Sequence, residues 1–100
     1  MQRDVAIQRL RGMQTELRQQ GVDHLYLFGS VARGDADASS DIDVAFDIKP
    51  EAELEFSLID QSRIMRHLSA ALSVRVDFVE RAYLRPRIAE RVAADMIQVF

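Results

Sequence analysis

The segment from residue 41 to residue 48 alternates strictly between apolar and mostly acidic side chains, and this pattern constrains the fold more than any other. Its apolar positions are Ile42, Val44, Phe46 and Ile48, and its other positions are Asp41, Asp43, Ala45 and Asp47. Because successive side chains of a strand project to opposite faces, one face is apolar and the other carries three carboxylates. The pattern predicts a half-buried strand that ends at Lys49-Pro50, where proline cannot continue a ladder. Such a strand requires a sheet with a hydrophobic layer on its apolar side.

The rest of the chain predicts the partners of that strand. The predicted helices cover residues 3–20 and 53–71 and a third helix that begins near Pro86; the predicted strands cover 24–28, 41–48, 74–79 and 97–100. The second helix is expected to bury a face formed by Leu54, Leu58, Met65, Leu68 and Leu72. Residues 31–40 predict one helical turn followed by a loop. This order predicts an α+β fold, a small mixed sheet of about four strands with helices packed against it.

Length and composition exclude several classes of protein. One hundred residues predict a single domain over residues 1–100, and the absence of cysteine excludes disulfides and thiolate metal sites. No apolar run is long enough for a membrane span and the N-terminus lacks a signal peptide, so we expect a cytoplasmic protein with no membrane contact. A net charge of −3 has the wrong sign for backbone tracking on nucleic acid, so no direct nucleic-acid binding is expected.

The acidic strand face predicts a metal site. Asp41 and Asp43 stand two residues apart on one face, where two carboxylates repel each other unless a cation lies between them. Hard oxygen ligands favour magnesium or manganese over zinc. Asp77, on the polar side of the strand predicted over 74–79, joins them if the two strands are neighbours. Three carboxylates on one sheet face suit two Mg²⁺ ions, or Mn²⁺, that hold the attacking and leaving oxygens in phosphoryl transfer.

A phosphate site is predicted next to it. The strand over 24–28 breaks at Gly29-Ser30 and enters a helical turn, and the free N–H groups of a helix start bind phosphate. Gly29 allows close backbone approach, Ser30 offers a hydroxyl and Arg33 adds positive charge. A phosphate cradle beside a carboxylate face predicts a nucleoside triphosphate site.

Residues 28–44 resemble the signature of the DNA-polymerase-β-type nucleotidyltransferase superfamily, which is Gly-Ser, ten residues, then Asp-x-Asp. The Ala-Arg-Gly after Gly-Ser, the Ser-Asp-Ile-Asp run and the later Val-Asp-Phe resemble the minimal nucleotidyltransferase (MNT) family, with a fold like the polymerase-β palm. The resemblance implies that Gly29 and Ser30 hold the triphosphate of ATP and that Asp41 and Asp43 bind both metals. Asp77 would be the third ligand and the base for the acceptor hydroxyl. Leu72-Ser73 departs from the family pattern, because many members carry a glycine before the third strand.

The resemblance also implies a partner. MNT proteins are commonly antitoxins of HEPN-domain ribonuclease toxins, and some transfer AMP from ATP to a toxin tyrosine. The first hypothesis is therefore AMP transfer to a partner hydroxyl, and the second is an antitoxin that acts by occlusion. The three carboxylates favour the enzyme, because a pure binding module does not need to keep repelling charges together. Transfer to a small molecule would call for a second domain, and a template-directed polymerase would need a longer chain with a basic surface.

The remaining charged residues receive less specific interpretations. Asp35, Asp37 and Asp47 are expected to be loop residues that aid solubility. The arginines around the last helix are expected to be a solvated face or a docking surface for an acidic partner; they are Arg81, Arg85, Arg87 and Arg91. The acceptor, the nucleotide preference and the stoichiometry of the complex stay open.

Overall fold

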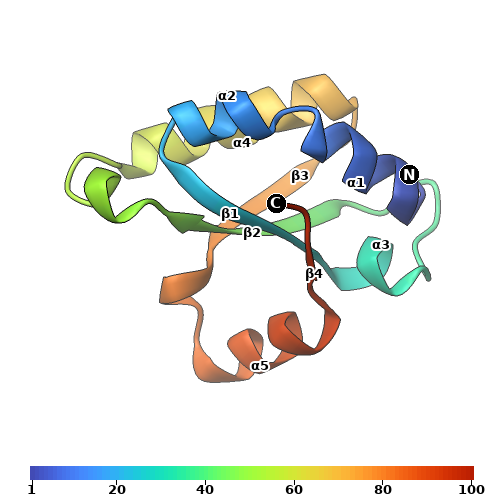
Figure 1. The fold of residues 1–100 in the computed structure, drawn as a ribbon. Helices are drawn as coiled ribbons and strands as arrows, with labels where there is room; N and C mark the ends of the chain where they lie inside the picture. The colour runs from blue at the N-terminus through green and yellow to red at the C-terminus, as the bar shows by residue number, and fades with distance from the viewer.

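The computed structural model describes residues 1–100 and contains a four-stranded sheet in the order β3-β2-β1-β4 (Figure 1). The strands are β1 (Val22–Phe28), β2 (Ile42–Ile48), β3 (Val76–Glu80) and β4 (Ile97–Gln98). β1 pairs antiparallel with β2 and β4, whereas β2 and β3 run parallel. The parallel pair requires a crossover connection, which the long helix between them supplies. The mixed sheet of four strands is confirmed.

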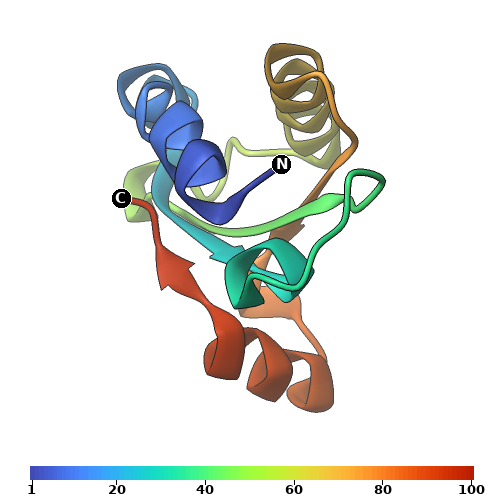
Figure 2. The ribbon, with the colours of Figure 1, turned by 90° about the vertical axis from the view of Figure 1, so that its right-hand side faces the viewer.

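The helices cover the two faces of the sheet unequally. They are α1 (Arg3–Arg11), α2 (Gln14–Gln19), α3 (Gly29–Arg33), α4 (Leu58–Leu72) and α5 (Pro86–Asp95), with 3₁₀ turns η1 (Pro50–Ala52) and η2 (Arg81–Tyr83). In Figures 1 and 2, α1, α2 and α4 lie together on one face, and α5 lies on the other. The main core is on the three-helix side and includes Leu10, Phe46 and Leu68. A smaller cluster is formed by Val92 of α5 with Tyr26 and Ala45 of the sheet, on the face to which the acidic residues of β2 also project.

Two helix predictions were wrong in their bounds. The helix predicted over 3–20 is interrupted at Gly12, because glycine is a poor helix former, and both halves still bury their apolar positions. The helix predicted from 53 begins at Leu58, because Ser57 and Asp60 form a reciprocal capping box that fixes its first turn. Leu54 and Leu58 are therefore exposed, and the buried face consists of Ile64, Leu68 and Leu72. No helix combines the length and the apolar character that a membrane crossing needs.

The expectation that Asp47 is a loop residue was wrong. Asp47 belongs to β2 and anchors η2. Its two carboxylate oxygens accept hydrogen bonds from Arg81 Nε and Nη2, both at 2.9 Å. The Tyr26 hydroxyl donates to the same carboxylate at 3.2 Å, and the Arg81 guanidinium lies 4.7 Å from the centre of the Tyr26 ring. Arg81 is thus held by a bidentate ion pair, so it is not a free docking contact.

Ser73 ends α4 in the left-handed conformation with a φ of 55°, and it is the one non-glycine residue of the chain with positive φ. This conformation costs a residue with a Cβ roughly 1 kcal/mol, and the greater freedom of glycine in the unfolded chain offsets about half of that gain. Ser73→Gly should therefore raise the free energy of unfolding by about 0.5 kcal/mol. Urea unfolding checks this, and a lower midpoint for the variant would show that Ser73 makes a compensating contact.

Candidate active site

Asp43 and Asp77 face each other across the parallel strands β2 and β3. Their Cα atoms are register partners, so the two side chains project side by side from one face of the sheet. Burial raises the pKa of Asp43 from its ordinary 3.8 to about 6, and the neighbouring Asp77 and Asp41 carboxyl groups add to this effect. A carboxyl pair held this close is electrostatically unfavourable as two anions, so it favours either a proton or a cation. The register thus brings together two residues that lie far apart in the sequence.

Asp41 lies on the same sheet face but is engaged by an arginine. The Arg75 Nε atom lies 3.8 Å from Asp41 Oδ2 and 3.9 Å from Asp77 Oδ1, so Arg75 bridges two of the three acids. In this arrangement no three carboxylates converge on one point as metal ligands. The Arg75 side chain is 75% exposed, so it can swing away at small cost. Sequence reasoning missed Arg75, although its spacing of two from Asp77 places both on one strand face.

Gly29 forms the contact between the phosphate turn and the acidic strand. It follows β1 with a φ of 75° and starts α3. A Cβ at this position would overlap the Asp43 Oδ2 atom, so the backbone of the turn approaches the carboxylate as only glycine permits. Ser30 is the next residue of α3 and is half-buried. The structure therefore brings Gly29 against Asp43, which is itself the register partner of Asp77, and Ser30 follows Gly29 directly.

Arg33 ends α3 and is held by two acidic residues. Its Nη1 donates to Asp95 Oδ2 at 2.8 Å and its Nε donates to Asp35 Oδ2 at 3.1 Å. The bond to Asp95 ties α3 to the end of α5, the bond to Asp35 is local, and both are exposed. Asp95 was missed because no local pattern links positions so far apart in the chain. A role for Arg33 at the triphosphate stays a prediction, and it would require Arg33 to exchange at least one carboxylate for phosphate.

Residues 10–99 match the nucleotidyltransferase domain family. The chain belongs to this family. The match spans β1, α3, β2 and β3, and therefore all the residues described above.

This nucleotidyltransferase is similar to a named enzyme and to a protein of solved structure. It is 35% identical over 85 residues to the protein adenylyltransferase MntA of Thermococcus cleftensis, covering 84% of this chain and 82% of that protein. A solved structure assigned to the minimal nucleotidyltransferases is 31% identical, with a TM-score of 0.79, and the match covers 97% of this chain and 95% of the other. The MNT resemblance and the nucleotidyltransferase fold are thereby confirmed.

A more distant structure shares the fold. It belongs to a complex described as a tri-AMPylated HEPN toxin of Shewanella oneidensis with an MNT antitoxin. The identity is 20%, the TM-score is 0.70, and the match covers 98% of this chain and 71% of that chain. At this identity the likeness concerns the fold alone.

The donor set of this nucleotidyltransferase fits a hard divalent cation. Asp43 and Asp77, register partners on β2 and β3, offer carboxylate oxygens on one face of the sheet. The absence of a side chain at Gly29 leaves the backbone of the turn against Asp43, where a bound triphosphate and its cation would meet both elements. Asp41 can join once Arg75 has left it.

The pKa of Asp43 predicts an unusual pH dependence of stability. Because this pKa is higher in the folded state than in the unfolded chain, the contribution of Asp43 to stability falls as the pH rises from about 4 to about 6 and is level above that range. Asp43→Asn should therefore stabilise the metal-free protein more at about pH 7 than at about pH 4. Thermal melts in EDTA at the two pH values test this. An equal effect at both would mean that Asp43 titrates normally.

Proposed function

We propose that this chain is a nucleotidyltransferase antitoxin that transfers AMP from ATP to a tyrosine hydroxyl of a HEPN-domain ribonuclease toxin and so neutralises it. The observation that supports the proposal is the register of Asp43 with Asp77 beside the Gly29 turn, because metal-assisted transfer from a triphosphate needs carboxylates close to the groups that hold the phosphates. The activity of the Thermococcus relative, named a protein adenylyltransferase, supports the reaction type. The AMPylated HEPN toxin bound by a protein of the same fold supports the acceptor.

The reaction joins the acceptor oxygen to the α-phosphorus of ATP and breaks the bond from that phosphorus to the diphosphate. Backbone N–H groups at the start of α3 and the Ser30 hydroxyl would hold the triphosphate. Asp77 would accept the proton of the acceptor hydroxyl, since the attack needs a base within reach of that proton. Two Mg²⁺ ions, or Mn²⁺, held by Asp41, Asp43 and Asp77, would supply charge neutralisation of the triphosphate and of the leaving diphosphate.

The acidic face makes ATP binding dependent on a divalent cation. Asp41, Asp43 and Asp77 carry negative charge toward the place where a polyanion must bind, so the bare triphosphate is repelled. We expect ATP to bind in magnesium and to show no measurable binding in EDTA. Titration calorimetry with the same protein in the two buffers tests this, and equal affinity in both would contradict the metal assignment.

Label transfer tests the reaction type. The chain is incubated with magnesium, ATP and a HEPN-domain ribonuclease, with the label either on the α-phosphate or on the γ-phosphate. The proposal predicts that the HEPN protein acquires the α label and not the γ label, since the bond that breaks lies between the α- and β-phosphates. Acquisition of the γ label would make the chain a phosphotransferase, and no label in either case would remove the enzymatic function.

Neutralisation by occlusion is the second candidate function, and Arg75 favours it. Its guanidinium lies between Asp41 and Asp77, where it compensates their charge without a metal. An antitoxin could keep such a site as a folded surface and block its toxin by contact.

A further inference from the structure

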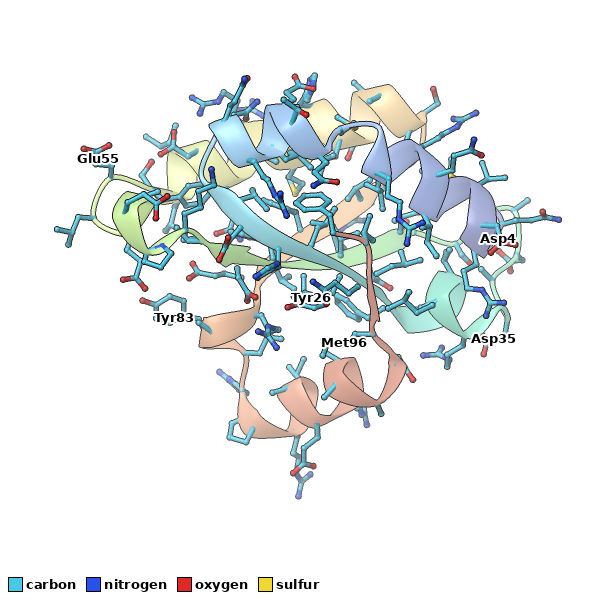
Figure 3. All side chains as sticks on the ribbon, in the orientation of Figure 1. Asp4, Tyr26, Asp35, Glu55, Tyr83 and Met96 are labelled. Carbon is cyan, nitrogen blue, oxygen red and sulfur yellow. The ribbon has the colours of Figure 1, made fainter.

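An apolar groove of about 720 Å³ lies at the carboxyl ends of β2 and β3, between the segment that leads into α4 and the turn η2. Phe56 and Val79 are among its lining residues, and Leu54, Leu58 and Tyr83 are the exposed apolar side chains along it. We call this the η2 groove. Figure 3 shows Tyr83 and Glu55 at this end of the molecule and Asp35, beside α3, at the opposite end. The groove is therefore separate from the carboxylate site.

Three apolar side chains along the η2 groove are too exposed to contribute to packing within the chain. Leu54, Leu58 and Tyr83 are 101%, 82% and 83% exposed, and they make up half of the large exposed apolar residues of the protein. The other three, Val5, Ile59 and Ile88, do not line the groove. A gathering of exposed apolar groups around one hollow marks a surface that binds another molecule.

The charges of the η2 groove define what it can bind. Glu53 and Glu80 line it, no lysine, arginine or histidine does, and neither glutamate takes part in an ion pair. Glu80 is half-buried, and burial together with the charges of Glu53 and Asp47 raises its pKa. An uncompensated pair of carboxylates beside apolar walls is complementary to a cation carried on an apolar scaffold.

We propose that the η2 groove docks a basic amphipathic segment of the acceptor protein, with large apolar side chains against Leu54, Leu58 and Tyr83 and a lysine or arginine between Glu53 and Glu80. The identity of the partner as the acceptor rests on the proposed function. The groove and the carboxylate pair lie at opposite ends of the same two strands, about 16 Å apart at the rise of a strand from Asp43 to Ile48. One protein can cover both places, so groove binding would hold the acceptor hydroxyl over the site.

The test compares groove variants with matched controls in the full chain. Leu54→Ser with Leu58→Ser removes the apolar walls, and Ile59→Ser is the control because Ile59 is exposed in the same first turn of α4 but outside the groove. Glu53→Arg reverses the charge of the groove, and Glu55→Arg makes the same change in net charge two residues away. Four quantities are measured for each variant: binding of the HEPN-domain ribonuclease, AMP transfer to it, calorimetric binding of magnesium-ATP, and self-association.

We predict that both groove variants bind the HEPN protein at least about tenfold more weakly and that the KM for the HEPN protein rises by a similar factor. Turnover at saturating HEPN protein and the binding of magnesium-ATP should stay near wild type. Both controls should behave as wild type. The inference is overturned if the groove variants bind the HEPN protein as tightly as the wild type does, or if the controls lose as much affinity as the groove variants. It is also overturned if only self-association changes, or if the HEPN protein does not bind the wild-type chain. If the HEPN protein binds through the groove but receives no AMP, the groove assignment holds and the proposed function fails.

Discussion

Asp43→Asn and Asp77→Asn should each lower the rate of AMP transfer at least about 100-fold while the fold is retained. The reason is that each change removes one oxygen ligand and one negative charge from the carboxyl pair at which the triphosphate and its cations would meet. The unfolding temperature of the metal-free variants should equal or exceed that of the wild type, because the repulsion between the two acids is relieved. Initial rates and thermal melts of the same preparations measure both effects.

Asp4→Asn is the matched control for these variants. It makes the same chemical change at a side chain that is 94% exposed, in the first turn of α1. Its transfer rate should be that of the wild type. If Asp43→Asn or Asp77→Asn also kept the wild-type rate, that aspartate would have no part in the reaction.

Gly29→Ala should be nearly inactive and less stable, and Gly29→Val should be worse. The positive φ of Gly29 costs a residue with a Cβ roughly 1–2 kcal/mol, and the added Cβ would also overlap the Asp43 carboxylate. The turn must then move away from Asp43, which separates the phosphate cradle from the acidic strand. Chemical unfolding and the transfer rate measure the two consequences.

Ser30→Ala provides the contrast for the Gly29 variants. Ser30 lies within α3 at ordinary helical geometry, so alanine leaves the backbone unchanged and removes one hydroxyl. We expect wild-type stability and a loss in rate well below that of Gly29→Ala, because a single hydrogen bond contributes about 1 kcal/mol. A Gly29→Ala variant as active as Ser30→Ala would show that close approach of the turn to Asp43 is unnecessary.

The part of the site that the sequence predicted depends on local periodicity. The alternation over residues 41–48 predicts which side chains of β2 face the core. The alternation around Asp77 predicts that this residue joins Asp43 on the acidic face, provided that β2 and β3 are neighbours, as they are. The residues that escaped prediction act across long separations. Arg81 pairs with Asp47 from 34 residues away, and Arg33 pairs with Asp95 from 62 residues away.

The η2 groove escaped prediction for a different reason. Leu54 and Leu58 fit a helical period with Leu68 and Leu72, and this period predicts that all four lie on the buried face of one long helix. The capping box of Ser57 and Asp60 starts the helix at Leu58 and leaves both leucines exposed. The Ser-x-x-Asp spacing of that box is visible in the sequence and could have moved the boundary.

The central claim is that this chain neutralises a HEPN toxin by covalent AMP transfer, and the most direct test removes the chain from the toxin after the reaction. The HEPN toxin is incubated with ATP, magnesium and either the wild-type chain or Asp43→Asn, then stripped of the chain under denaturing conditions, refolded, and assayed for mass and ribonuclease activity. We predict that toxin from the wild-type reaction carries the added mass of AMP and stays inactive, while toxin from the Asp43→Asn reaction is unmodified and active. Recovery of full activity and unchanged mass in both samples would contradict the account and leave occlusion as the mechanism.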